Sequence, residues 1–165
     1  MKIIIDGSGI TEFKGRKMRY TIGKGGIAEN KVEGDKATPT GFHKPMTIFY
    51  RAGRMMRPRN KYFDIYPIYQ NDGWCDALND PSYNHYVRRP YKGSSENLWR
   101  KDRLYDMIIV SDYNYPNAIA PYGSAVFIHV CHPEFKPTLG CIGFEPDDLW
   151  FIVHNLKPDD GFLVI

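Results

Sequence analysis

The sequence lacks the features of a membrane protein and of a repeat protein. No apolar run approaches the roughly 20 residues that a membrane-spanning helix needs, and the mean hydropathy is negative, at −0.47. No internal repeat or low-complexity tract is visible along the 165 residues. A chain of this length is most simply one domain with a core that buries most of its apolar surface. We therefore expect a single domain, residues 1–165, that is monomeric and does not insert into a membrane.

Neither charge sign dominates the sequence, and no nucleotide-binding loop is present. The chain has 22 Lys and Arg against 19 Asp and Glu, for a net charge of +3, so it shows no uniform footprint for nucleic acid. Four arginines lie within residues 51–60, which we interpret as a solvated loop. The glycines of residues 23–26 lack the GxGxxG spacing, and no amphipathic helix follows them. These observations predict no nucleic-acid partner.

Cysteine is scarce, and its number is odd. Cys75, Cys131 and Cys141 cannot all pair within one chain, so at least one thiol is free. No CxxC pair is present. The segment MKIIIDGSGI at residues 1–10 is too short for the apolar region of a secretory signal, and it reads as a first strand. The odd cysteine count favours a chemical role for one thiol.

Short β-branched and aromatic runs separated by turn residues dominate the remainder. Pro146 and the acids after it predict a helix that begins at Glu145 or Pro146, and a Ser-x-Glu pattern predicts a second, short helix over residues 96–101. We expect a mainly β domain, an antiparallel sandwich or partly closed barrel, with these one or two short helices. The predicted strands are Lys2–Ile5, Lys17–Ile22, Met46–Arg51, Tyr62–Tyr69, Tyr105–Ser111, Ser124–Val130 and Phe162–Ile165.

A histidine and a cysteine stand at two ends of one stretch, residues 125–144, AVFIHVCHPEFKPTLGCIGF. His129 lies in an apolar strand, and a Pro-containing loop returns to Cys141. A catalytic cysteine attacks as the thiolate, and because a free thiol has a pKa of about 8.5 an imidazole or backbone dipoles must activate it. Gly140 lets backbone N–H groups turn toward an oxyanion, and the hydroxyl of Thr138 is placed to hold the imidazole or the substrate.

Three other interpretations of these residues stay open. One is a zinc site built from His129, Cys131, His132 and Cys141, although the spacing is poor for a structural site. Another is a disulfide between Cys131 and Cys141, which would block the nucleophile. The last is an ordinary buried cysteine beside a core histidine.

The stretch TLGCI at residues 138–142, preceded by His129, resembles the active-site signature of the L,D-transpeptidase catalytic domain, the YkuD family. Residues 37–42, ATPTGF, are similar to a loop that lies early in the same domain. Residues 73–76 (GWCD), 80–84 (DPSYN) and 98–106 (LWRKDRLYD) resemble a compact branch of that family. The resemblance therefore covers nearly the whole chain.

Two positions depart from the family pattern. The spacing from His129 to Cys141 is shorter than in most members, and Gly143 stands where many carry Arg or His. Arg88, Arg89 and Arg100 are candidates to replace that basic residue.

The resemblance implies acyl transfer on peptidoglycan stem peptides. Cys141 would attack the carbonyl that follows an L-residue, His129 would take the thiol proton, and the N–H groups of Gly140 and Cys141 would bind the oxyanion. A neighbouring amine would give a cross-link and water a trimmed peptide, so a hydrolase of the same fold, an L,D-carboxypeptidase or endopeptidase, is an alternative. A noncatalytic wall-binding or zinc-stabilised module is another. The implied activity needs no metal or cofactor.

The family resemblance also implies ligands and a location. Carbapenems are expected inhibitors, and the periplasm or cell envelope is the expected location, although no signal peptide is visible in this chain. Residues 71–91 show no periodicity, and a long irregular segment in a compact domain is often functional. We interpret this segment as a loop that walls the substrate groove. Its expected substrate-binding residues are Trp74, Asp76, Tyr83, Asn84 and Arg88.

Overall fold

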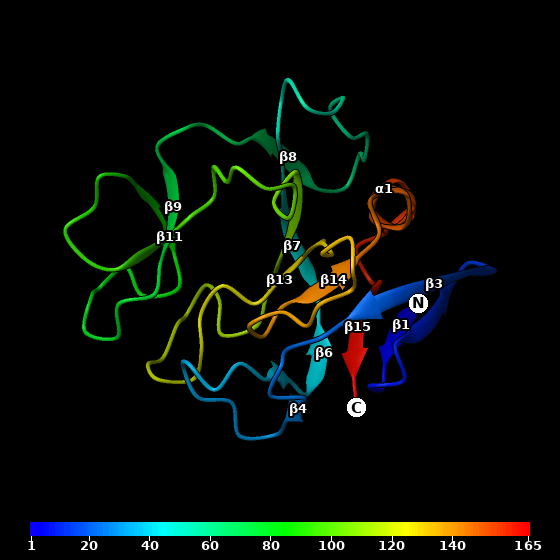
Figure 1. The fold of residues 1–165 in the computed structure, drawn as a ribbon, viewed down its shortest axis with the longest axis horizontal. Coiled ribbons are helices and arrows are strands. Elements are labelled where there is room, and N and C mark those ends of the chain that lie inside the picture. The colour runs from blue at the N-terminus through cyan, green and yellow to red at the C-terminus, as the bar shows by residue number, and fades with distance from the viewer.

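A seven-stranded sheet forms the centre of the computed structural model, which describes residues 1–165 (Figure 1). Two of its strand pairs, β13–β14 and β7–β8, are parallel, and the other pairs are antiparallel. The sheet is therefore mixed, where we expected antiparallel strands. Its strands in spatial order are β2 (Ile10–Phe13), β3 (Arg16–Thr21), β14 (Ile142–Phe144), β13 (Phe127–Val130), β12 (Met107–Ser111), β7 (Pro45–Tyr50) and β8 (Asp64–Pro67).

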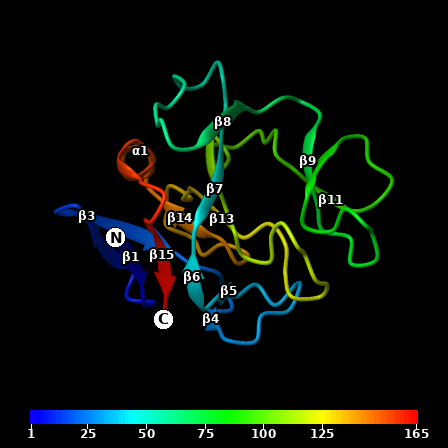
Figure 2. The same ribbon diagram turned by 180° about the vertical axis from the view of Figure 1, so that it is seen from behind.

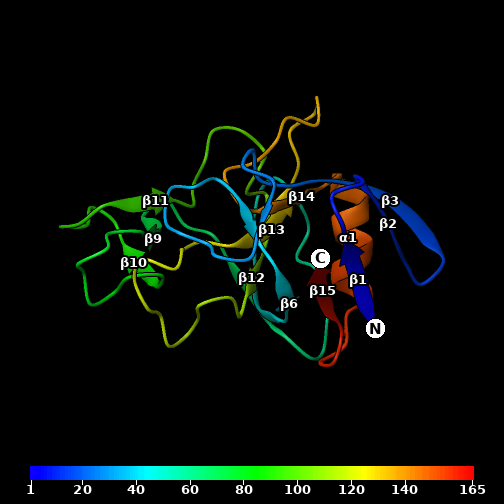
Figure 3. The same cartoon turned by 90° about the horizontal axis from the view of Figure 1, so that it is seen from below.

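Three smaller sheets surround the central one. Two have three strands each and the third is a two-stranded parallel pair. The sheet that contains β9 lies at one end of the molecule, and β1, β15 and the helix lie at the other (Figures 2 and 3). Their strands are β1 (Lys2–Ile5), β15 (Gly161–Val164) and β6 (Gly41–His43); β10 (Tyr86–Arg88), β9 (Asp72–Cys75) and β11 (Ser95–Asn97); and β4 (Ile27–Ala28) with β5 (Thr38–Pro39).

A single helix, α1 (Pro146–Asn155), follows β14 and confirms the prediction made from its first residues. Proline at the first helical position has no N–H to satisfy, and Asp147 and Asp148 complement the positive end of the helix dipole. Asp148 is also paired with Arg16, whose Nη2 lies 2.6 Å from the carboxylate. The buried face of α1 places Leu149, Ile152 and Val153 in the core.

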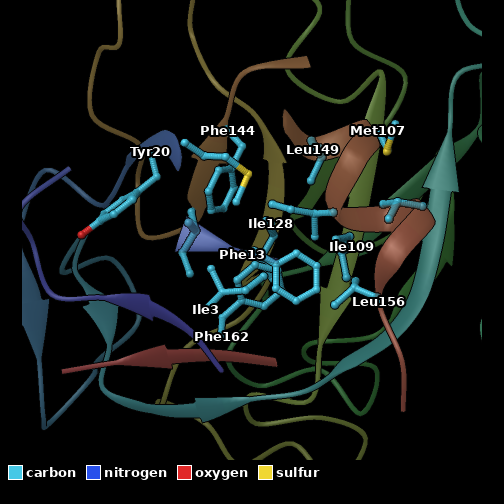
Figure 4. Packing of buried hydrophobic residues seen from close by; sticks show 14 of the residues in the cluster. Ile3, Phe13, Tyr20, Met107, Ile109, Ile128, Phe144, Leu149, Leu156 and Phe162 are labelled. Carbon is cyan, nitrogen blue, oxygen red and sulfur yellow. The ribbon is translucent and has the colours of Figure 1, made fainter. Parts of the chain in front are cut away.

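Buried side chains form two clusters, one on each face of the central sheet. The larger cluster has 20 residues and lies between the sheet, α1 and the β1–β15 pair (Figure 4). The smaller cluster has nine and lies between the sheet and β9–β11. Because side chains alternate along a strand, β12 sends Ile109 to the larger cluster and Ile108 to the smaller one. This explains why β12 and β13 are buried along their whole length.

The structure confirms the mainly β class and the sandwich interpretation, and no sheet closes into a barrel. The helix predicted over residues 96–101 is wrong, because Ser95–Asn97 is β11 and pairs with β9. The side chain of Asn97 accepts a hydrogen bond from the Trp99 N–H at 3.0 Å, and such a local turn competes with a helix. Residues 71–91 are also more ordered than expected, since they contain both β9 and β10.

Candidate active site

Cys141 lies in the bend just before β14, beside the start of β13. Because β13 and β14 run parallel, the loop that joins them must return from the end of one strand to the beginning of the other. The Cys141 thiol donates to the Ala125 carbonyl at 3.1 Å, and the Phe127 N–H donates to Sγ at 3.4 Å. The backbone at the start of β13 thus holds the sulfur of a residue that is 9% exposed.

Two threonine hydroxyls hold the backbone carbonyl of Cys141. Thr138 Oγ1 donates to this oxygen at 2.6 Å, and Thr38 Oγ1 lies 3.4 Å from it. Thr38 is fully buried, and it accepts a hydrogen bond from the Gly23 N–H at 2.9 Å. The two segments that carried the family resemblance, about 100 residues apart in sequence, therefore meet at Cys141. Thr138 contacts the backbone of the loop rather than the imidazole.

Gly140 brings the cysteine loop close to residue 37. Its φ of +133° is a conformation that residues with a side chain rarely adopt, and a Cβ there would lie 3.0 Å from the Ala37 carbonyl oxygen. The Gly140 N–H donates to Thr138 Oγ1 at 3.1 Å, so this expected oxyanion donor already has a partner. The Cys141 N–H has no hydrogen-bond partner.

His129 on β13 is 5% exposed. Its Nδ1 lies 2.8 Å from the Val130 carbonyl. Because a carbonyl only accepts, Nδ1 carries the proton and Nε2 keeps its lone pair. Burial lowers the pKa of His129 to about 4, although the Val130 carbonyl raises it. The ring of Tyr105 stands edge-on to the imidazole at 5.2 Å.

The Cys141 thiol is neutral at rest. Burial raises its pKa to about 12, and the charge of Glu96 raises it further, whereas the Phe127 N–H, Lys31 and Arg100 lower it. No hydrogen bond joins the thiol to His129. Cys141 and His129 are thus a neutral thiol and a neutral imidazole that line the same cavity. To transfer its proton to the imidazole, the thiol must first break its hydrogen bond to the Ala125 carbonyl.

A cavity of about 570 Å³ is lined by Cys141 and His129 together with residues from several other segments of the chain. It holds all four predicted catalytic residues. A larger and more open hollow, of about 1020 Å³, lies beside the end of α1 and contains none of the predicted site residues. The residues that line the smaller cavity include Cys141, His129, Thr138, Gly140, Lys31, Asp76, Glu96 and Arg100.

Of the five expected substrate-binding residues, only Asp76 lines this cavity. Its Oδ1 is buried and has no hydrogen-bond partner. Trp74 and Asn84 are 2% exposed, and Trp74 Nε1 donates to Asn84 Oδ1 at 2.8 Å. The Tyr83 hydroxyl donates to Glu33 Oε2 at 2.6 Å, and Arg88 is exposed at the end of β10, away from the cavity. The structure thus places four of the five outside the cavity.

The lining residues that escaped the sequence-based prediction include Lys31, Glu96 and Tyr105. Lys31 stands in a turn-rich segment with no periodicity. The Tyr105 hydroxyl donates to Glu96 Oε1, and burial raises the pKa of Glu96. Residues 98–106, which contain Tyr105, carry part of the family resemblance. That segment does not reveal that Tyr105 pairs with Glu96.

The alternative chemistries of the cysteines find no support in the geometry. No group of three or more His, Cys, Asp or Glu side chains is placed to hold a metal ion, so the four residues considered as zinc ligands do not converge. All three cysteines are unbonded. Cys131 packs instead against Gly143, where a Cβ would lie 3.0 Å from the Cys131 Cβ and 2.6 Å from Thr21 Oγ1.

Fold and site together define a mainly β domain with a cysteine and a histidine in one cavity. The family model of the L,D-transpeptidase catalytic domain, YkuD, matches residues 3–165, and the chain belongs to this family. The family acts on peptidoglycan peptides and is generally associated with the cell envelope. No curated protein and no solved structure matches the chain. The structure contains no helix with the length and apolar character to span a membrane.

Proposed function

We propose that this chain transfers acyl groups on peptidoglycan stem peptides through a thioester on Cys141. The observation that carries the proposal is the single cavity that holds the Cys141 thiol together with a His129 imidazole whose Nε2 is free to accept a proton. Membership of the L,D-transpeptidase family supplies the substrate class. The proposed donor is a stem peptide cleaved after an L-residue.

The reaction would proceed in two halves. The thiol proton moves to His129 Nε2, Sγ bonds to the substrate carbonyl carbon, and the carbonyl oxygen becomes an oxyanion. When the C–N bond breaks, the leaving D-residue amine takes the proton from His129, and a thioester remains. An acceptor amine then attacks the thioester and gives its proton to His129, and the C–S bond breaks to release a thiolate, which regains that proton.

We assign the oxyanion to the N–H of Cys141, because this donor has no partner at rest whereas that of Gly140 is bonded to Thr138. Buried donors fixed in advance cost no reorganisation when the charge forms. Thr38 and Thr138 would contribute by holding the Cys141 carbonyl, which belongs to the peptide unit next to the one that carries the donor. Asp76, with a buried carboxylate oxygen that lacks a partner, is the residue of the β9–β11 region that we propose to contact the substrate.

Incubation with a carbapenem followed by intact-mass measurement tests the nucleophile. The wild type should gain one adduct, Cys141→Ser should gain none, and His129→Gln should react at least tenfold more slowly. Cys75→Ser and Cys131→Ser are matched controls that should react like the wild type. An adduct that persists in Cys141→Ser would contradict the assignment.

Purified muropeptides separate transfer from hydrolysis. With excess acceptor peptide, the proposal expects cross-linked dimers whose formation requires Cys141. If only trimmed monomers appear, the chain is an L,D-carboxypeptidase or endopeptidase that uses the same thioester. The comparison therefore decides which nucleophile, amine or water, completes the second half of the reaction.

A further inference from the structure

Lys31 is a buried cation beside the candidate active site. Its side chain is 5% exposed, which is unusual for a lysine. Lys31 Nζ is ion-paired with Asp35 and donates to the Val32 carbonyl at 3.2 Å. An ammonium group has three N–H donors. The third has no protein acceptor, and Lys31 lines the cavity that contains Cys141.

Two glycines make room for the path of this side chain. A Cβ on Gly123 would lie 3.1 Å from both Cγ and Cε of Lys31, and a Cβ on Gly140 would lie 3.8 Å from Nζ. The aliphatic stem therefore passes over Gly123, and the ammonium group ends at the residue that precedes Cys141. This places a fixed positive charge against the cysteine loop from a segment more than 100 residues away in the sequence.

The charges around Cys141 otherwise give little support to an ionised sulfur. His129 on β13 is neutral, and Glu96 on β11 opposes ionisation of the thiol. Asp76, just after β9, adds a second carboxylate to the cavity, and the Tyr105 hydroxyl is bonded to Glu96. Three other cations line the cavity. Arg100 donates from both Nε and Nη2 to Asp102, at 2.8 and 2.6 Å, and Lys36 and Lys136 are exposed to solvent.

We infer that Lys31 stabilises the negative charge that forms on the Cys141 sulfur. This deepens the function proposed above and rests on Cys141 as its nucleophile. Gly143, two positions after the cysteine, has no side chain, and Thr21 and Cys131 fill the space around it, so this position supplies no charge to the sulfur. The positive charge thus comes from a different part of the chain.

Alkylation of Cys141 by iodoacetamide tests the inference without any peptidoglycan substrate. The reagent is neutral; Sγ displaces iodide and the thiol proton is lost to solvent, so the rate follows the thiolate fraction. Rates for Cys141, separated from Cys75 and Cys131 by peptide mapping, are measured from pH 7 to 9.5. A nearby opposite charge shifts a thiol pKa by about one unit or more, so Lys31→Met should slow alkylation about tenfold at every pH.

Matched variants separate charge from structure. Lys31→Arg keeps the charge and should retain most of the rate, and Lys36→Met, which removes an exposed lysine from the same cavity, should change it less than twofold. Asp35→Asn breaks the same ion pair but leaves Lys31 uncompensated, so it should accelerate alkylation. If the Lys31–Asp35 ion pair were only structural, Lys31→Met and Asp35→Asn would change the alkylation rate of Cys141 in the same direction.

Equal rates for Lys31→Met and the wild type would overturn the inference, as would slower alkylation in Asp35→Asn. Melting curves identify variants that fail to fold, and Asp35→Asn keeps the test decisive if Lys31→Met is one of them. Failure of the proposed function is a separate result, because it would show as absent acyl transfer while the alkylation rates still depended on residue 31.

Discussion

At the scale of single residues, Gly140 combines a backbone conformation that favours glycine with a close contact to another segment. Its φ is +133°, and a Cβ at this position would lie 3.0 Å from the Ala37 carbonyl oxygen, so the Ala37 backbone would have to move by a few tenths of an ångström to admit a side chain. The same residue connects Thr138 to Cys141. A side chain here would therefore shift residue 37 or the loop that carries Cys141.

We predict that Gly140→Ala lowers the free energy of unfolding by about 2 kcal/mol or more, because strain and the close contact add together. It should also slow carbapenem acylation more than tenfold. Gly53→Ala is the control, since Gly53 has a φ of +88° but no neighbour within 4 Å and lies outside the cavity, and it should cost about 1 kcal/mol with acylation unchanged. Urea unfolding and intact-mass kinetics measure both. Equal losses in the two variants would show that crowding at Gly140 is unimportant.

His129 predicts how stability depends on pH. Burial lowers its folded-state pKa to about 4, below the ordinary value near 6.5, so between these values the unfolded chain binds a proton that the folded chain does not. The stability contribution is complete above pH 6.5 and is lost as the pH falls toward 4, by about 3 kcal/mol. His43, whose pKa burial also lowers, acts in the same direction.

Urea unfolding at pH 7.5 and 4.5 checks this expectation. The wild type should lose more stability across the interval than His129→Gln, by about 2 kcal/mol or more. Carboxylates titrate in both proteins and cancel in the comparison. If both proteins lose the same amount, the neutral state of His129 contributes nothing to the pH dependence.

At the scale of elements, the sheet of β9, β10 and β11 is tied to β13 through Asn84. Asn84 Oδ1 accepts from Trp74 Nε1 and from the Ala125 N–H, at 2.8 and 2.9 Å. Its Nδ2 donates to the Asn114 carbonyl at 2.6 Å. The Ala125 carbonyl also accepts a hydrogen bond from the Cys141 thiol, so one amide side chain links the small sheet to Cys141 through Ala125.

We predict that Asn84→Ala destabilises the protein by about 2–4 kcal/mol, because it leaves several buried donors and acceptors without partners. Acylation of Cys141 should slow as Ala125 is released. Asn117→Ala, at an exposed residue, should change neither quantity. Thermal unfolding with carbapenem kinetics provides the measurement, and a stable Asn84→Ala protein would contradict the linkage.

The sequence predicts elements where one local pattern decides the outcome. β-branched runs predict β12 and β13, and Pro146 with two acids predicts α1. The same reasoning misses β9, since DGWC is buried at all four positions and shows no alternation. It also predicts a helix over residues 96–101, which overlaps the strand Ser95–Asn97, because a local pattern does not reveal the strand partner supplied by β9.

The candidate site divides in the same way. His129, Thr138 and Cys141 are candidates from sequence because they lie in segments that resemble the family signature. Lys31 and Glu96 are not, because only the folded chain brings them to the cavity. Trp74, Tyr83 and Asn84 show the opposite case: their composition is typical of a binding surface, yet the structure buries them outside the cavity.

At the scale of the whole molecule, the central sheet separates two cores with different relations to the cavity. The larger cluster contains residues of α1 and the β1–β15 pair, and the smaller one contains Cys141 itself together with Trp74, Leu98 and Phe127. Damage to either core lowers stability. Only the smaller core includes Cys141.

A pair of leucine substitutions tests this division. Leu98 in the smaller cluster and Leu149 in the larger one are 1% and 0% exposed, so Leu98→Ala and Leu149→Ala should each cost about 2–5 kcal/mol. Under conditions where both variants remain folded, only Leu98→Ala should slow carbapenem acylation, by about tenfold or more. Equal acylation rates would indicate that the two cores act as one.

The position of Cys141 within the smaller core has a consequence for local opening of the native state. An acyl group on this sulfur contacts the cavity only while the core around it is closed, and these contacts stabilise the closed conformations. Amide hydrogen exchange in β9 and β11 should therefore slow after acylation, whereas exchange in α1 and β15, on the other face of the sheet, should stay nearly the same unless it occurs by global unfolding. Amide exchange in β9 and β11 would then report acylation of Cys141, although neither strand contributes an atom to the thioester.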